Sequence, residues 1–214
     1  MAILTDHCTA TRPLHTGGRD LPPETWLGWM AAFTRCLVGL ICTLTLLGLP
    51  VSPQTMAQDH HEEYALKAAF LYNFAKFAEW PTMSFPNDHA PFVICLAGND
   101  PFGPNLTSLE GKLVRDRPLA TKPIPGNDNL IGCHILYISP GELKQTRNIL
   151  QTLQKSPVLT VCDAEGCAET GIMLNMRMVE NRVALDLNLE AVQQTPLKLS
   201  AQLIRLTRIV KGHP

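Results

Sequence analysis

The chain has 214 residues and a formal net charge of −1, with 18 Lys and Arg against 19 Asp and Glu. Its basic residues form no cluster, which argues against a nucleic acid as the partner, because nucleic-acid-binding surfaces concentrate Lys and Arg. About 157 residues follow Ala57, enough for one ordinary domain that buries most of its surface on folding.

The chain up to Ala57 is predicted to be an N-terminal extension and a signal peptide. The uncharged apolar run over 36–49, CLVGLICTLTLLGL, has the length of a signal-peptide core and is too short to span a bilayer comfortably. Thr55 and Ala57 fit the small residues of a cleavage site, so we expect cleavage after Ala57. Met30 opens an ordinary signal peptide, which favours translation from Met30. The alternative is a disordered cytoplasmic tail over 1–29 on an uncleaved anchor, which leaves the domain in the same compartment.

The stretch EEYALKAAFLYNFAKFAEWP, residues 62–81, is predicted to be one helix that ends at Pro81, because proline disfavours the helical conformation of the residue before it. Its large apolar side chains recur at helical spacing and form a stripe that we expect to face the core. They are Leu66, Phe70, Phe74, Phe77 and Trp80. The opposite side is small and apolar, so we expect a second packing partner there.

Two residues of this helix are candidate binding residues. Asn73 lies within the apolar stripe, where a buried amide must be hydrogen bonded, either to a neighbouring strand or in a pocket that a polar ligand enters. Trp80 either packs in the core or is an exposed anchor for a protein partner. The second alternative is considered because aromatic residues dominate the energetics of interfaces.

A predicted strand over 92–97, FVICLA, ends at the turn GNDPFG. Ligands of open α/β sheets sit beyond the carboxyl ends of such strands, so Asn99, Asp100 and Gly103 are candidate residues of a small-molecule site. The same residue types also serve in turns and helix caps, and that structural interpretation is the alternative.

Arg115 and Arg117 precede a short predicted edge strand over 118–121. Two arginines near a strand end can hold a phosphate or a carboxylate through forked hydrogen bonds. The alternative is that both side chains are simply solvated.

Two further apolar runs, 134–139 and 157–162, alternate with helical segments and are typical of parallel βαβ units. Residues 171–180 and 183–189 then alternate apolar and polar side chains. Because about two residues join them, they predict a β-hairpin and hence a mixed sheet.

A terminal helix is expected over 200–210, with Ser200 as its N-cap. The predicted fold is therefore α/β. We expect a single domain over 62–210, with a mixed, mostly parallel sheet flanked by helices and with a C-terminal β-hairpin and helix.

Four of the seven cysteines lie beyond the signal peptide, and an even count in an exported domain indicates two disulfides with three possible pairings. Cys162 and Cys167 flank a four-residue turn that is short enough to close locally. Cys95 and Cys133 then pair by elimination. A zinc site that includes His134 is the alternative, although neither CxxC nor HxxxH spacing occurs.

The sequence contains no GxSxG, HExxH or P-loop motif and no GxGxxG after a strand. Disulfide bonding leaves no free thiolate as a nucleophile. His134 opens an apolar strand, where a hydrogen-bonded core histidine is expected. Asp163 and Glu165 could form a carboxylate pair, but a solvated turn is the favoured interpretation. We therefore predict that the protein is not an enzyme and uses no cofactor or metal.

Several motifs follow one another in fixed order between Tyr64 and Val210. They are YALKAAFLYNFAKFAEWP, VICLAGNDPFG, CHILYIS, PVLTVCDAEG and LNLEAVQQTPLKLSAQLIRLTRIV. This arrangement resembles the YfiR-like family of small periplasmic proteins, long described as a domain of unknown function. The resemblance agrees with the cysteine pairing and implies a periplasmic regulator, because the best-known member represses a membrane-bound diguanylate cyclase from the periplasm.

On this resemblance, we expect a homodimeric regulator that engages the periplasmic part of an inner-membrane diguanylate cyclase in cyclic di-GMP signalling. The alternative is a solute-binding component of a sensor or transporter, which holds a small anion with the turn over 99–103 and with Arg115 or Arg117. A typical solute receptor closes two lobes over its ligand, whereas one lobe is predicted here.

Overall fold

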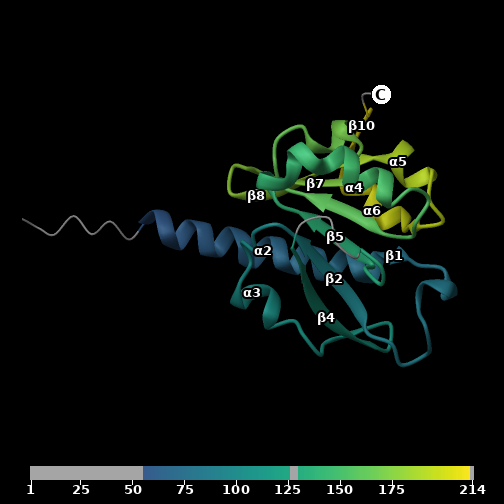
Figure 1. Cartoon of the computed structure of the whole chain (residues 1–214). Coiled ribbons are helices and arrows are strands. Elements are labelled where there is room, and N and C mark those ends of the chain that lie inside the picture. Colours follow the sequence, from purple (N-terminus) through teal and green to yellow (C-terminus); the bar gives the residue numbers. More distant parts are fainter. Residues whose placement is uncertain (1–54, 126–129, 213–214) are drawn as a thin grey trace, which may run out of the picture. The chain divides into compact units, whose positions relative to one another are not determined.

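An eight-stranded sheet forms the centre of the computed structural model, which describes residues 55–125 and 130–212 (Figure 1). In spatial order its strands are β10 (Thr207–Val210), β8 (Arg182–Asn188), β7 (Leu174–Val179), β6 (Leu159–Cys162), β5 (Ile135–Ile138), β2 (Phe92–Ala97), β4 (Arg117–Ile124) and β3 (Leu113–Val114). Neighbouring strands from β7 to β4 are parallel, as are β10 and β8, whereas β7–β8 and β3–β4 are antiparallel. The predicted mixed, mostly parallel α/β sheet and its hairpin are confirmed.

Helices cover both faces of this sheet, because successive side chains of a strand point to opposite sides. In β2, Ile94 and Leu96 belong to one core and Cys95 and Ala97 to the other. The first core includes side chains from α2 (Thr55–Phe77), α5 (Leu189–Gln193) and α6 (Ala201–Arg205), and from Leu106 of α3 (Pro104–Thr107). The second includes side chains from α4 (Thr146–Thr152) and from the 3-10 turn η3 (Cys167–Thr170).

Four short elements complete the described fold. They are the 3-10 turns η1 (Thr82–Ser84) and η2 (Pro140–Gln145), and a two-stranded antiparallel pair formed by β1 (Ala78–Glu79) and β9 (Lys198–Leu199). The first helix therefore ends at Phe77, four residues before Pro81. The helix stops there because β1 pairs with β9 and because the Ser200 N–H donates to the Phe77 carbonyl.

The side of α2 that enters the core is not the predicted stripe. Ala68, Leu71 and Ala75 are at most 1% exposed, whereas Leu66 is 39% exposed. The small alanines let the helix lie close to the sheet, so the side that we expected to meet a second partner is the buried one. Of the stripe, Phe74 is buried and the other three aromatic residues are half-buried.

Asn73 lies on the exposed side of α2. The prediction that this amide is buried is therefore wrong, and its side chain needs no protein partner. The physical reason is that α2 buries its alanine side, so the centre of the predicted stripe, where Asn73 lies, faces solvent.

The C-terminal segment is helical for only half of the predicted length. Ser200 caps α6 as expected, its Oγ accepting a hydrogen bond of 3.1 Å from the Leu203 N–H. After Arg205 the chain turns into β10, which pairs in parallel with β8. Thr207, Ile209 and Val210 are β-branched and pack better in a strand than in a helix. The predicted helix over 200–210 is thus wrong from Leu206 onward.

The predicted edge strand over 118–121 is part of the longer β4, which pairs with β2 over six positions. β3 covers only the first two residues of β4, so most of its outer side has no strand beside it within the described ranges. Prolines are tolerated on such an open side, because the missing N–H removes no sheet hydrogen bond.

The predicted extension and the apolar run over 36–49 lie outside the described residues. Thr55, the first described residue, begins α2, so translation from Met30 and cleavage after Ala57 stay predictions. Within the described ranges, no helix combines the length and the hydropathy needed to cross a membrane.

Candidate functional site

The loop after β6 contacts both layers of the molecule. Cys162 and Cys167 form a disulfide, with Cα atoms 6.6 Å apart, and belong to the core that α4 covers. Asp163, the next residue after Cys162, faces the other way and contacts α2. A six-residue loop thus carries a cross-link on one side and a carboxylate on the other.

The Asp163 carboxylate is buried and accepts three hydrogen bonds. Its Oδ2 accepts from Tyr64 Oη at 2.8 Å and from Lys67 Nζ at 2.7 Å. Its Oδ1 accepts from Tyr137 Oη at 2.7 Å, and the Asp163 side chain is only 1% exposed. The prediction that Asp163 belongs to a solvated turn is therefore wrong, whereas Glu165 is exposed as expected.

Lys67 supplies the positive charge that allows this carboxylate to be buried. Its side chain is 3% exposed, forms a second ion pair with Glu63, and places Nζ 4.6 Å from the centre of the Tyr64 ring. A buried charge costs several kcal/mol unless it is paired and hydrogen bonded, and here both conditions are met. Glu63, Tyr64, Lys67, Tyr137 and Asp163 are called the Asp163 cluster below.

The two tyrosines of the Asp163 cluster act as fixed hydrogen-bond donors. Burial, followed by the negative charge of Asp163, raises the pKa of both Tyr64 and Tyr137 well above the ordinary value. Phe102 packs edge-on against both rings, with centroids 5.3 Å and 4.8 Å away. The cluster therefore holds α2 against the disulfide loop, and its carboxylate is engaged by three donors.

Sequence reasoning missed this cluster because its members are far apart along the chain. Lys67 and Tyr64 lie on α2, Tyr137 lies on β5 and Asp163 follows β6. One signal was present: Lys67 is the one charged residue between Glu63 and Lys76, in a helix that is otherwise largely apolar over this stretch. A lysine at such a position needs a buried counter-charge, but only the fold reveals that Asp163 supplies it.

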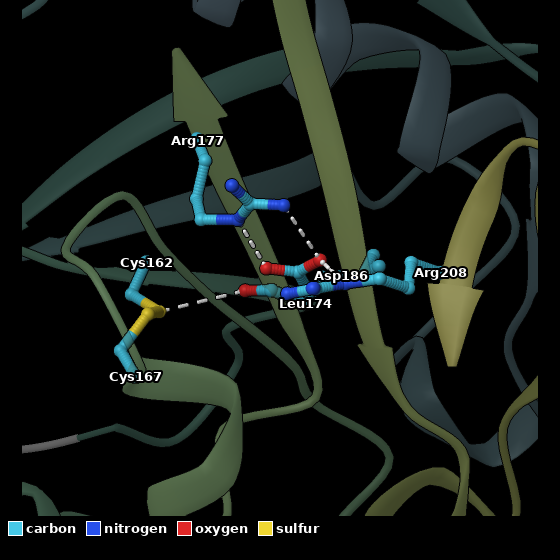
Figure 2. Close-up of polar contacts among 6 residues, drawn as sticks. All are labelled: Cys162, Cys167, Leu174, Arg177, Asp186 and Arg208. Atoms are coloured by element: carbon cyan, nitrogen blue, oxygen red, sulfur yellow. Dashed lines mark hydrogen bonds and ion pairs between the residues drawn. A yellow bond between two sulfur atoms is a disulfide. The ribbon is translucent and has the colours of Figure 1, made fainter. Parts of the chain in front are cut away.

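A second buried carboxylate joins β7, β8 and β10 (Figure 2). Asp186 of β8 accepts from Arg177 Nε at 2.5 Å, from Arg177 Nη2 at 3.2 Å and from Arg208 Nε at 2.8 Å. Burial alone would raise the pKa of Asp186, but the hydrogen bonds from Arg177 and Arg208 outweigh it and hold the pKa below its ordinary value. Figure 2 also shows the Cys162 sulfur facing the Leu174 carbonyl of β7, and these two atoms are 3.6 Å apart.

Trp80 and His134 form part of an aromatic group that holds the loop after β1. Trp80 Nε1 donates to the His134 carbonyl at 3.1 Å, and its half-buried ring packs edge-on against Phe92. His134 is 2% exposed, accepts from the Val93 N–H through Nδ1 at 3.0 Å, and stacks on Phe85. His134 is therefore the core histidine that the sequence predicted, and Trp80 contributes to packing.

The turn after β2 uses its polar residues locally. Asp100 Oδ1 accepts from the N–H groups of Phe102 and Gly103 at 2.8 Å and 3.1 Å. Gly103 has φ of 50°, a conformation that favours glycine, and Asn99 is exposed. Two interpretations were considered for this turn, a small-molecule site and a structural turn with a helix cap. These contacts agree with the structural one.

The two candidate arginines do not meet this turn. Arg117 lies at the amino end of β4, with its guanidinium 3.9 Å from the centre of the Phe85 ring and with hydrogen bonds to the carbonyls of Asn87 and Ala90. Arg115 is half-exposed and forms an ion pair of 3.5 Å with Glu79. Since β2 and β4 are parallel, Arg117 and the turn lie at opposite ends of the sheet and form no common anion site.

The second disulfide joins Cys95 of β2 to Cys133, just before β5, with Cα atoms 5.7 Å apart. Both disulfides have the pairing reached from the sequence. The cysteines that the zinc alternative required are therefore used in these cross-links.

The comparison with family models matches residues 64–208 to the YfiR/HmsC-like family. The chain belongs to this family. The match covers both disulfides, the Asp163 cluster from Tyr64 onward, and the Asp186 group, and it confirms the resemblance found in the sequence. The comparison with curated proteins finds no match.

Proposed function

We propose that this YfiR/HmsC-like protein is a periplasmic regulator that represses an inner-membrane diguanylate cyclase by binding its periplasmic part, and so modulates cyclic di-GMP. Family membership over residues 64–208 carries the proposal. Two disulfides within the same domain support export, because such bonds persist in oxidising compartments.

The polar groups of the described domain support a binding role. Asp163 and Asp186, the two buried carboxylates described above, are each held by donors from other secondary-structure elements. Such groups fix the arrangement of helix and strands. A rigid domain of this kind presents a defined surface to a partner at low entropic cost.

The test is the cellular level of cyclic di-GMP in a strain that lacks this chain. We expect a rise relative to the wild type, reversed by a gene that starts translation at Met30. A matched gene whose product lacks residues up to Ala57 keeps the domain in the cytoplasm and should not reverse the rise. An unchanged level in the deletion strain, or reversal by the leaderless product, would contradict the proposal.

The solute-binding alternative receives no support from the geometry. Its two groups of candidate residues, the turn over 99–103 and Arg117, lie at opposite ends of β2, and Arg115 contacts Glu79 instead. We therefore put forward the regulatory function alone.

A further inference from the structure

The outer side of β10 is an open edge of the eight-stranded sheet (Figure 1). β10 pairs with β8 over four positions, from Thr207 opposite Leu185 to Val210 opposite Asn188. No strand lies on its other side within the described ranges. Half of the backbone N–H and C=O groups of such a strand point away from the sheet and can pair with another extended chain.

An apolar row of the core stops at this edge. Pairing places Val161, Leu174, Leu187 and Ile209 side by side across β6, β7, β8 and β10. The first three are fully buried at 0% exposure, whereas Ile209 is 56% exposed. Leu206, just before β10, is 63% exposed. One more strand beyond β10 would continue the row and cover Ile209.

The opposite face of the same edge carries an exposed cation, Arg208. The pairing sets Arg208 beside Asp186, whose carboxylate also binds Arg177, and Glu165 and Glu169 act on Arg177 from the side away from the edge. The Arg208 side chain is 63% exposed. Arg205, at the end of α6, and Lys211, directly after β10, are also exposed near this edge. An acidic side chain on an added strand would meet Arg208 as its cross-strand neighbour.

We propose that the outer edge of β10 binds an extended, acidic segment of a partner protein, which adds a ninth strand to the sheet. The segment has an apolar residue beside Ile209 and an Asp or Glu next to it in sequence, beside Arg208, because adjacent residues of a strand point to opposite faces. This inference names a surface for the proposed regulator and depends on the proposed function only in requiring a protein partner.

The charges argue against a second copy of the chain as the occupant. Arg208 lies on the edge strand, and Arg205 and Lys211 lie shortly before and after it, so two copies paired edge to edge would bring like charges together. Positive charge on an edge strand hinders self-association of this kind. An acidic segment from another protein meets the same edge with attraction instead of repulsion.

The first test uses a synthetic peptide of alternating Val and Asp, labelled with a fluorophore, and the full chain exported and purified from the periplasm. Anisotropy titrations compare it with a Val and Lys peptide of equal length and with an N-methylated Val and Asp peptide. We expect the acidic peptide to bind at least about tenfold more tightly than either control, because charge complementarity and backbone pairing both contribute. Equal binding of the acidic and basic peptides, or no binding of the acidic one, would overturn the proposal.

The second test places the binding on β10. Ile209→Glu should weaken acidic-peptide binding at least about tenfold, because it adds a negative charge at the centre of the edge. Leu113→Glu is the matched control: Leu113 is 60% exposed on β3, at the other edge of the sheet, and its change should leave binding within about twofold. Circular dichroism of both variants monitors folding. Equal loss in the two variants would contradict the inference.

Sedimentation and cyclic di-GMP separate the remaining outcomes. If the wild-type chain is a dimer that Ile209→Glu dissociates, the edge binds a second copy and the partner inference fails. If deletion of the chain leaves cyclic di-GMP unchanged while the acidic peptide binds at β10, the proposed function fails and the edge inference stands. If deletion raises cyclic di-GMP but the peptide does not bind, the edge inference alone fails.

Discussion

The most consequential residues of the described domain are Lys67 and Asp163, a buried pair 96 positions apart in the sequence. Each is at most 3% exposed, and together with Glu63 and two tyrosine hydroxyls they satisfy one another. Such a pair contributes little net stability compared with apolar residues of equal volume, but the loss of one partner leaves a charge stranded in the core. The pair therefore determines the position of α2 on the sheet more than it adds to the stability of the domain.

Asp163→Asn should lower the free energy of unfolding by about 3 kcal/mol or more, because Lys67 would lose its buried counter-charge and keep an ion pair with Glu63 alone. The double variant Lys67→Met with Asp163→Asn should recover part of that loss, since the stranded charge is then gone. Urea unfolding under non-reducing conditions measures these two variants and Lys67→Met alone. Strictly additive losses in the two single variants and the double variant would contradict the coupling.

His134 makes stability depend on pH. Burial lowers the pKa of His134 from 6.5 to about 4. Between these values the unfolded chain binds a proton that the folded chain does not, so stability falls as the pH decreases from 6.5 to 4 and levels off below. The loss should reach about 3 kcal/mol relative to neutral pH. Urea unfolding as a function of pH should show this slope in the wild type but not in His134→Phe, while His89→Gln, an exposed histidine, should retain it.

At the scale of elements, the short disulfide loop and the long helix α2 form one unit. The Cys162–Cys167 bond fixes the loop, and Asp163 within the loop binds two side chains of α2. The two halves of this unit lie on opposite faces of the sheet. A change in the loop should therefore change the local stability of the helix.

Replacing Cys162 and Cys167 by serine should speed amide hydrogen exchange in α2, over residues 64–75, more than in β2. The released loop holds Asp163 less firmly, so local opening of the helix costs less free energy. Glu165→Gln, an exposed change in the same loop, is the control and should leave exchange in α2 unchanged. An equal increase in α2 and β2 would indicate global destabilisation and contradict the coupling.

At the scale of the whole molecule, two disulfides reinforce the sheet differently. Cys95–Cys133 links residues 38 positions apart and encloses β3 and β4, whereas Cys162–Cys167 links residues five positions apart. In the chain-entropy description, a longer closed segment restricts the unfolded state more. The first bond therefore contributes most to the stability of the domain, and the second mainly fixes a local loop.

Removal of Cys95–Cys133 by a double change to alanine should lower the free energy of unfolding by about 4 kcal/mol, against about 2 kcal/mol for the Cys162–Cys167 pair. Urea titrations of the two double variants provide the comparison. A larger loss from the short loop would show that its contribution comes from the contacts of Asp163 rather than from chain entropy.

The sequence by itself determined the fold class, the family and the cysteine pairing. Apolar runs of strand length predicted the central strands, because buried parallel strands consist of consecutive apolar residues whatever their neighbours are. Alternation of apolar and polar residues predicted the β7–β8 hairpin for an equally local reason. Ser200 as a cap and His134 as a core residue followed from local chemistry as well.

Only the tertiary structure decided which side of α2 is buried, that Asn73 faces solvent, and that residues 207–210 form a strand. The helix has apolar residues on two sides, so its rotation depends on the distant carboxylate of Asp163, which pairs with Lys67. The last segment becomes a strand because β8 offers it an open edge, a partner that no local pattern reveals. Contacts between residues far apart in the chain therefore decided the candidate site and the edge of β10.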